Sequence, residues 1–291
     1  MKRTRLDPDY FCTRSWARRL KDSLSRLQGD RRSVPFLDGH VRVVRNLLLD
    51  GDGGPRVVVN IGADALLSFL AADDYKNIYA NPVVGGKRLE PTVERKRVDA
   101  LLALPGAANF HFGAVALGGA GVRFYGEYCM VLRPSRVSND TRLFDRDSYD
   151  LLQPPLAGFG ATRTRRIVDS LSGRWGTDLV DMLLMKMMPR LPATQHLITA
   201  GTVSSLVMSD QEFVEVHLHG KIAGRDLEEV RQLPEEAAIE ASIVNRRRGR
   251  ESPTLVEIHW VAQRRKVLRR LAQVSVPYRM TTLYGKGNQW A

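Results

Sequence analysis

The residue types best suited to chemistry cluster in one short stretch, residues 211–220, which read QEFVEVHLHG. Alternation with a period of two is typical of a β-strand, and it places Phe213, Glu215, His217 and His219 on one face, with valine and leucine on the other. We expect the apolar face to enter the core. A carboxylate beside imidazoles suits chemistry that develops positive charge on a sugar ring. An edge strand with a solvated polar face is the alternative.

Several common catalytic signatures are missing from the sequence. It contains no G-x-x-x-x-G-K-[ST] phosphate loop, no G-x-G-x-x-G between a strand and a helix, no G-x-S-x-G nucleophile elbow and no H-E-x-x-H helix. His217 and His219 have no third ligand near them in the sequence, so we predict no metal site. The two cysteines, Cys12 and Cys129, form neither a disulfide framework nor a zinc motif, which favours a reducing compartment.

The composition is that of an ordinary folded protein. Of the 291 residues, 43% are hydrophobic and 26% are charged, which is enough to form one large core or two smaller ones. No run approaches the roughly 18 to 20 apolar residues of a membrane span, so we expect none. No apolar stretch of signal-peptide length follows the basic N-terminus, which argues against general secretory export.

Basic residues outnumber acidic ones by 44 to 32, a net charge of +12. Much of the excess lies in residues 246–250 (RRRGR) and 264–270 (RRKVLRR). Such charge favours contact with nucleic acid, acidic proteins or anionic cofactors. A noncatalytic basic protein that binds nucleic acid or an acidic protein is therefore the main alternative to an enzyme. Solvated helix faces explain the same clusters more simply.

The order of the expected elements favours an α+β fold with a largely antiparallel sheet. Strands are expected over 57–61, 110–117, 126–132, 142–144, 196–208, 213–219 and 274–283, and helices over 10–28, 63–72, 92–104, 161–188, 226–232 and 235–245. The helical region 161–188 is expected to be interrupted near Gly173 and Gly176. Residues 254–273 are either one helix or a strand that turns into one. The glycine-rich turn at 50–55 divides an N-terminal helical extension (1–54) from a domain over 55–291. If the first helix is a docking or delivery element, a chain lacking residues 1–30 should still fold.

A series of short motifs runs in order along residues 55–232. They are DYKN at 74–77, the Gly85-Gly86 loop, FGAVAL at 112–117, YGEYCMVLRP at 125–134, Asp147-Ser148, FVEVHLHG at 213–220 and DLEEV at 226–230. In these motifs and their order the chain resembles bacterial toxin and effector proteins related to ADP-ribosyltransferases.

This resemblance implies a split β-sandwich with helical additions at its N- and C-terminal ends. The family binds NAD+ as a substrate between its two sheets, transfers ADP-ribose to a target and releases nicotinamide. Glu215 would then stabilise the oxocarbenium charge, with His217 as its orienting partner. The remaining residues implied to contact NAD+ or to brace the glutamate are Tyr75, Asn77, Phe112, Gly113, Tyr125, Gly126 and Ser148. The reaction requires no metal.

The resemblance also implies a toxin or secreted effector that modifies a protein or nucleic acid of a host or competitor. An immunity or chaperone protein is then a further partner. The location is the bacterial cytoplasm before a specialised system delivers the protein into a target cell. Asn60 stands where relatives are expected to carry histidine, and Ala80 where they carry a carboxylate. Either the substrate differs, or the scaffold binds NAD+ without cleaving it. A phosphodiester hydrolase using Glu215, His217 and His219 is a third interpretation.

Overall fold

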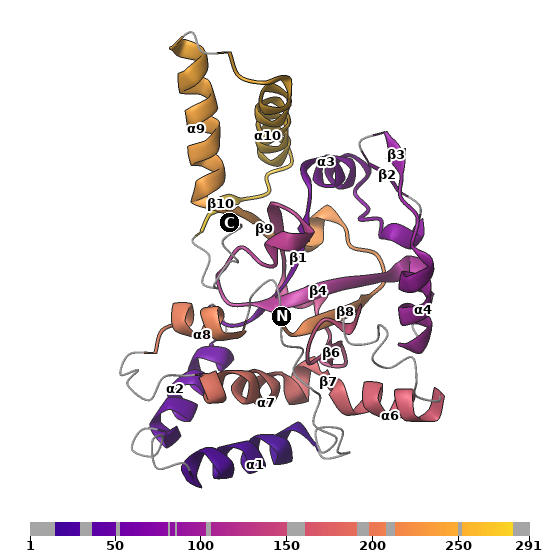
Figure 1. Ribbon diagram of the computed structural model, residues 1–291, viewed down its shortest axis with the longest axis vertical. Coiled ribbons are helices and arrows are strands. Elements are labelled where there is room, and N and C mark those ends of the chain that lie inside the picture. Colours follow the sequence, from indigo (N-terminus) through magenta and orange to yellow (C-terminus); the bar gives the residue numbers. More distant parts are fainter. Residues whose placement is uncertain are drawn as a thin grey trace.

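The computed structural model describes residues 15–29, 37–50, 53–80, 82–84, 86–102, 106–149, 161–190, 198–207, 213–249 and 252–281. They form a mixed α+β fold built on one open, mostly antiparallel sheet of eight strands (Figure 1). This confirms the expected fold class at that level.

The sheet has the strand order β10-β9-β5-β1-β4-β8-β6-β7. Its strands are β1 (Arg56–Ile61), β4 (Phe110–Ala116), β5 (Tyr128–Leu132), β6 (Arg142–Phe144), β7 (Ser172–Arg174), β8 (Glu215–His219), β9 (Leu227–Gln232) and β10 (Tyr278–Met280). All neighbours are antiparallel except β9 and β10, which are parallel. A separate hairpin joins β2 (Val83–Val84) to β3 (Lys87–Arg88). The strands follow one continuous order, whereas a split β-sandwich has two sheets.

Strands β1 and β4 pair over only three residues and then diverge. Their register joins Arg56–Val58 to Ala114–Ala116, after which β1 continues along β5 and β4 along β8. Gly113 lies at the closest approach, where an added Cβ would be 2.8 Å from the backbone oxygen of Val58. Beyond this junction the halves β10-β9-β5-β1 and β4-β8-β6-β7 separate, and the sheet opens into a wedge.

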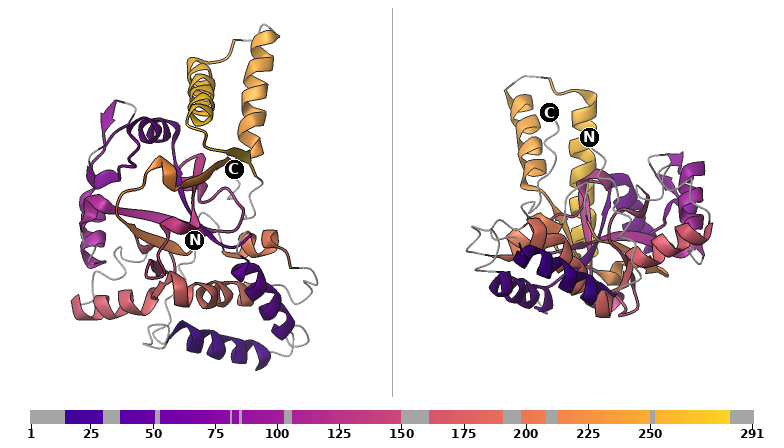
Figure 2. Two further views of the ribbon diagram at one scale, coloured as in Figure 1. Left: turned by 180° about the vertical axis from the view of Figure 1, so that it is seen from behind. Right: turned by 60° about the horizontal axis from the view of Figure 1, so that its bottom comes forward.

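Helices pack around this sheet in two groups. Below it in Figure 1 lie α1 (Trp16–Gly29), α2 (Leu37–Leu49), α6 (Ala161–Leu171), α7 (Trp175–Met187) and α8 (Ala200–Val207). Near the open end of the wedge lie α3 (Ala63–Ala72) and α4 (Val93–Leu101), with short 3-10 turns at η3 (Ile78–Ala80), η4 (Ala107–Asn109) and η5 (Arg123–Tyr125). Helices α9 (Pro234–Arg248) and α10 (Leu255–Gln273) project from the body as a hairpin, as both views in Figure 2 show.

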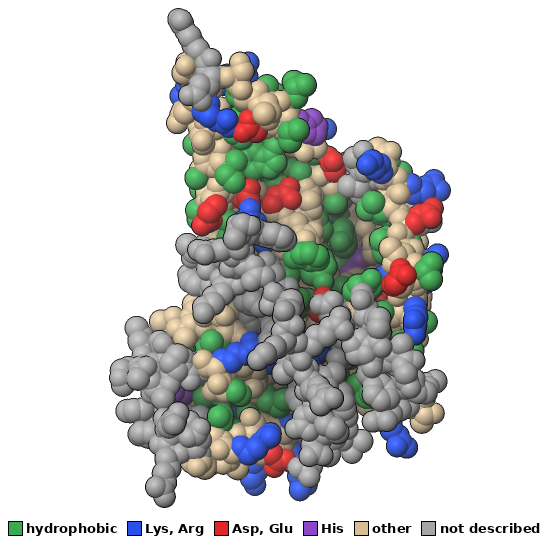
Figure 3. Space-filling view, viewed as in Figure 1, with side chains coloured by type: hydrophobic (Ala, Val, Ile, Leu, Met, Phe, Trp, Pro, Cys, Tyr) green, Lys and Arg blue, Asp and Glu red, His purple; other side chains and the backbone are tan. Residues whose placement is uncertain are grey.

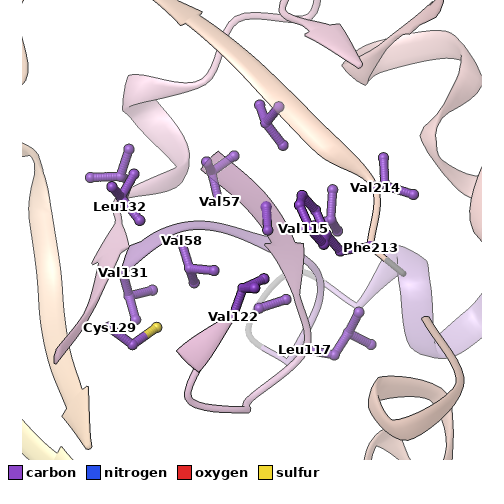
Figure 4. Packing of buried hydrophobic residues seen from close by; sticks show 14 of the residues in the cluster. Val57, Val58, Val115, Leu117, Val122, Cys129, Val131, Leu132, Phe213 and Val214 are labelled. Atoms are coloured by element: carbon purple, nitrogen blue, oxygen red, sulfur yellow. The ribbon is translucent and has the colours of Figure 1, made fainter. Parts of the chain in front are cut away.

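The main core lies along the central strands. Valine side chains of β1 and β4, including Val57, Val58 and Val115, pack with Val131 and Leu132 of β5 (Figure 4). All five are at most 1% exposed. Side chains on both faces of these strands are buried, so the valine run of β1 and the apolar residues of β4 and β5 show no alternation of buried and exposed positions.

The N-terminal helices belong to this same core. Trp16 and Leu20 of α1 and Val44 and Leu48 of α2 are buried in one cluster with the sheet residues. The indole Nε1 of Trp16 donates a hydrogen bond of 2.8 Å to the backbone oxygen of Ser172 in β7. The segment expected as an extension therefore contributes to the hydrophobic core shared with the rest of the molecule.

Residues 226–232 were expected as a helix, and this is wrong because most of them form strand β9. Leu227 and Val230 are three residues apart, a spacing typical of one face of a helix. In the structure, the pairing with β5 shifts register between Val131 and Leu132, which is a β-bulge. The extra residue changes the alternation, so that both apolar side chains are buried within a strand.

The expected strand over 196–208 is also wrong, because residues 200–207 form helix α8. The β-branched pair Thr202 and Val203 favours strands by propensity alone. Here the hydroxyl of Thr199 accepts a hydrogen bond from the backbone N–H of Thr202 at 3.2 Å, which caps the helix. Val203 is fully buried, so tertiary packing outweighs the propensity.

Most other elements confirm the expectation. Helix α3 and strand β6 span the expected residues, and residues 255–273 form one helix. The interruption expected near Gly173 in the helical region 161–188 is confirmed, because residues 172–174 form β7. Within the described part of the expected final strand, residues 278–280 are a strand. No helix in the described ranges is long and apolar enough to cross a membrane.

Candidate functional site

A pocket of about 630 Å³ lies where β1 and β4 diverge. Its walls come from the open ends of these strands, the start of α3, residues 75–79, α4, η5 and the start of β8. Figure 3 shows hydrophobic side chains in this hollow beneath α3. Its size is typical of small-molecule and cofactor sites.

The predicted site residues divide into two groups. Those that line the pocket are Glu215, Tyr75, Asn77, Phe112, Gly113 and Tyr125. His217, Ser148 and Gly126 are not among the lining residues, and they contact the pocket walls from behind.

Glu215 is the carboxylate on the wall formed by β8. This strand lies between β4 and β6, so the alternative of a solvated edge strand is wrong. Glu215 pairs with Ala114 on one side and Phe144 on the other, and it is 3% exposed. A buried carboxylate is costly unless its oxygens accept hydrogen bonds. The buried carboxylate of Glu215 therefore requires hydrogen-bond donors beside it.

Both oxygens of Glu215 accept hydrogen bonds. Oε1 lies 2.5 Å from Nε2 of His217, and Oε2 accepts the backbone N–H of Ser148 at 3.3 Å. Ser148 follows β6 in a turn that Asp145 anchors through ion pairs with Arg146 at 2.9 Å and Lys186 at 3.6 Å. The sequence prediction placed Ser148 beside Glu215, and the structure shows that the contact is made by its backbone.

The imidazole of His217 is enclosed by aromatic rings. Phe144 stacks on it with centroids 6.0 Å apart, while Phe110 and Phe112 meet it edge-on at 5.4 and 5.3 Å. Its side chain has no solvent exposure. The ring is therefore held in one orientation, with Nε2 directed at the carboxylate. His219, two residues further along β8, is exposed.

Tyr75 and His111 form a second pair of rings on the pocket wall, with centroids 5.2 Å apart. Burial raises the pKa of Tyr75 to about 12, so its phenol stays protonated at neutral pH. Burial, together with the positive charge of Arg136, lowers the pKa of His111 to about 4, so its imidazole is neutral. The sequence analysis did not select His111, because it falls among apolar residues of a strand.

Asn77 has a structural role at the pocket wall. Its Nδ2 donates a 2.5 Å hydrogen bond to the backbone oxygen of Phe110, and its Oδ1 accepts the N–H groups of Tyr79 and Ala80 at 2.9 and 3.1 Å. The side chain thereby joins the turn η3 to the first residue of β4. Ala80, where a carboxylate was expected, lies in this turn.

Asn60 and Gly126 hold the glycine-rich loop between β4 and β5 against β1. The amide Nδ2 of Asn60 donates to the backbone oxygens of Ala120 and Gly126 at 2.9 and 3.1 Å, and Oδ1 accepts the N–H of Val122 at 2.8 Å. Gly126 has a φ of +154°, and a Cβ there would lie 2.1 Å from the backbone of Ile61. Only glycine fits this approach. The side chain of Asn60 thus fixes this loop at the rim of the pocket.

Tyr125, at the end of η5, forms part of the rim. Its hydroxyl donates a 2.7 Å hydrogen bond to Asp147 in the turn after β6. Its ring meets Phe213 edge-on at 6.4 Å, and the neighbouring Phe124 is 66% exposed. The rim therefore links β5 to the turn that carries Ser148.

Arg95 of α4 is a pocket residue that the sequence analysis missed. Its guanidinium lies 4.1 Å from the ring centre of Phe112, and its Nε donates to Asp99 at 2.8 Å. Burial opposes its charge, but the hydrogen bond with Asp99 and the negative charges of Asp99 and Glu215 outweigh burial and raise the pKa of Arg95. Tyr79 also donates to Asp99 at 2.6 Å. The i, i+4 spacing of Arg95 and Asp99 was visible, but such pairs are usually solvated.

The described part of the chain contains no group of three or more His, Cys, Asp or Glu side chains placed to hold a metal ion. No family model matches the chain, and no curated protein or solved structure is significantly similar to it. The function must therefore be argued from the site: a pocket with a buried carboxylate on one wall, a cation beside it, and aromatic rings along its length.

Proposed function

We propose that the pocket binds NAD+ and that the protein transfers ADP-ribose from it to a macromolecular target, as a toxin or secreted effector. The observation that carries this proposal is the buried, fixed carboxylate of Glu215 at the point where the sheet opens. The reaction places positive charge on a ribose, and a preorganised anion stabilises that charge.

In the proposed reaction, the bond between the nicotinamide nitrogen and ribose C1′ breaks, and its electron pair leaves with nicotinamide. The cationic C1′ is then attacked by a lone pair of the acceptor atom, which loses its proton. Glu215 accepts a hydrogen bond from a ribose hydroxyl and faces the developing charge. His217 and Ser148 each donate one hydrogen bond to it, and each carboxylate oxygen keeps a further acceptor site. They are positioning residues.

The other pocket residues fit the remainder of the substrate. The ring of Tyr75 offers an apolar face for nicotinamide, and Arg95 offers a guanidinium for a diphosphate. The Nη2 atom of Arg95 is buried and has no hydrogen-bond partner among the described residues. A phosphate oxygen would satisfy it.

The divergence of β1 and β4 supports the proposed likeness to the ADP-ribosyltransferase fold. A split sheet creates a cleft between two sets of strands, and here the pocket lies between β10-β9-β5-β1 and β4-β8-β6-β7. The target, the delivery system and an immunity or chaperone partner rest on the sequence resemblance alone.

A protein that only binds polyanions has less support, because much of the basic charge is engaged within the molecule. Arg264 is 6% exposed, and both Arg264 and Arg265 pair with Glu240. Arg270 donates to the backbone oxygen of Leu70 at 3.0 Å. The expected basic face of α10 is therefore partly an internal ion-pair network. The phosphodiester hydrolase is also less supported, because His219 is exposed rather than buried beside Glu215.

The test is nicotinamide release from NAD+, with calorimetric titration of NAD+ as a second readout. Glu215→Gln keeps the shape and removes the charge, so turnover should fall about 10² to 10³-fold while binding remains. Glu235→Gln, on an exposed residue at the start of α9, is the matched control and should behave like the wild type. Equal turnover by Glu215→Gln and the wild type would contradict the assignment. If the wild type neither binds nor cleaves NAD+, the proposal fails.

A further inference from the structure

The hairpin of α9 and α10, called the arm below, projects from the body (Figures 1 and 2), and α10 contacts the body from Gln263 toward its C-terminal end. Helix α10 packs on α3 there, with Gln263 donating to Asp64 at 2.7 Å and Arg270 donating to Leu70. Helix α10 has 19 residues, a length of about 28 Å. Its first turns therefore extend beyond the part that touches the body.

Ion pairs hold the two helices of the arm together. Glu240 of α9 pairs with Arg264 and Arg265 of α10, and Arg246 pairs with Glu257 near the free end. These contacts fix the hairpin as a unit. Arg265, Lys266 and Arg269, nearer the base, are also exposed, so the free end differs from the base in its aliphatic side chains rather than in charge alone.

The free end of the arm carries exposed aliphatic side chains. Leu255 and Val256 are 85% and 78% exposed, and Ile258 is 40% exposed. Thr254 caps the helix: its hydroxyl accepts the N–H of Glu257 at 3.2 Å, and the Glu257 carboxylate accepts the N–H of Thr254 at 2.8 Å. The first turn of α10 is therefore rigid, and its aliphatic side chains are held in water at a free-energy cost.

Basic residues lie at the same end. Arg247 and Arg248, in the last turn of α9, are exposed. Glu257, the acidic residue described there, is already paired with Arg246. Figure 3 shows hydrophobic and basic side chains next to one another on the upper part of the arm. The end of the arm, defined as Arg247, Arg248, Leu255, Val256 and Ile258, thus combines an apolar projection with excess positive charge.

We propose that the end of the arm docks on an anionic lipid membrane surface. A projecting apolar turn enters the boundary between headgroups and acyl chains, and neighbouring arginines contact the phosphates. The shape favours a lipid surface, because the aliphatic residues project from a hairpin rather than line a groove. Nucleic acid offers no partner for Leu255 and Val256. A second copy of the arm would bring like charges together. The inference is independent of the proposed function.

The test is co-sedimentation of the full chain with vesicles at about 0.15 M ionic strength. One set contains phosphatidylcholine alone, and the other contains phosphatidylcholine with about 30% phosphatidylglycerol. The wild type should partition at least about tenfold more strongly to the anionic vesicles. Leu255→Ser/Val256→Ser should lower that partitioning about tenfold, and Arg247→Gln/Arg248→Gln should have an effect of similar size.

Matched controls are available on other helices. Val93, the first residue of α4, is also 78% exposed and also follows a threonine cap, so Val93→Ser should leave vesicle binding unchanged. Arg165→Gln/Arg166→Gln, on exposed residues of α6, controls for net charge. Two results would overturn the proposal. The first is no binding of the wild type to anionic vesicles. The second is equal loss in the arm variants and their controls, which would assign binding to overall charge.

Discussion

Nε2 of His217 lies 2.5 Å from Oε1 of Glu215, and the two side chains are 0% and 5% exposed. The residues are two apart in β8, so they share one face of the sheet and sit next to each other along it. An N–H on Nε2 satisfies this contact, because the carboxylate oxygen can only accept. The Nδ1 atom has no hydrogen-bond partner among the described residues, so the contact through Nε2 orients the ring.

Removing this imidazole should destabilise the protein, because the buried carboxylate of Glu215 then lacks one of its hydrogen-bond donors. His217→Phe keeps an aromatic ring among Phe110, Phe112 and Phe144 but deletes the donor, and it should lower the free energy of unfolding by about 1 to 3 kcal/mol. The double variant Glu215→Met/His217→Phe removes the carboxylate as well and should recover most of the loss. Urea denaturation measures both. A double variant no more stable than His217→Phe would show that the pair is not the origin of the effect.

Gly126 and Gly39 should respond in opposite ways to alanine. At Gly126 the new Cβ would lie 2.1 Å from the backbone of Ile61, and the backbone has a positive φ. Gly126→Ala should therefore destabilise the protein by about 3 kcal/mol or more. Gly39 lies in α2 with nothing within 4 Å of the new Cβ, so Gly39→Ala should add up to about 1 kcal/mol. Thermal denaturation separates the two; similar shifts in both variants would contradict the described loop geometry.

His111 should make the protein less stable in acid. Its pKa is about 4 in the folded state, below the ordinary value of about 6.5, so protonation favours the unfolded state. The stability it contributes is fully present above about pH 6.5 and is lost as the pH falls toward about 4, a change of about 3 kcal/mol. The free energy of unfolding of His111→Gln should depend less on pH over this range. His259→Gln, on an exposed residue of α10, should keep the wild-type dependence.

Trp16 should be as important to stability as a residue of the central sheet. It is 3% exposed and donates to Ser172, so Trp16→Ala should cost about 3 to 5 kcal/mol. Leu49→Ala, on a 66% exposed residue of α2, should stay within about 0.5 kcal/mol of the wild type. Deletion of residues 1–30 should likewise abolish or strongly lower the cooperative thermal transition. An unchanged transition after that deletion would show that α1 is dispensable.

Local patterns predicted much of this fold. The valine run of β1, the alternation in β8 and the threonine that opens α4 are contained in a few consecutive residues, and those elements were found. The pattern of residues 254–273 does not decide between one helix and a strand that turns into one, and residues 255–273 form the helix α10. Strand β9 was missed because a bulge, set by its partner β5, makes its apolar spacing resemble a helix. Helix α8 was missed because its packing against α7 outweighs its β-branched composition.

The candidate site also contains residues that local sequence patterns predict and residues whose roles depend on the tertiary fold. Glu215 was selected because its strand alternates, and its contact with His217 follows from strand geometry. The contributions of Arg95 and His111 depend on how α4 and β4 come together around the opening of the sheet, which no short stretch of sequence records. The structural roles of Asn60 and Asn77 depend on backbone atoms of distant segments, Ala120 and Phe110 among them.

Helix α10 connects the end of the arm to the pocket. Gln263, which bonds Asp64, lines the pocket, and Leu255 lies eight residues earlier on the same helix. That spacing corresponds to a rise of about 12 Å. The helix therefore holds whatever the end of the arm binds at a fixed distance from the pocket. Under the proposed function, this distance would select which acceptor groups on the bound surface can reach the pocket.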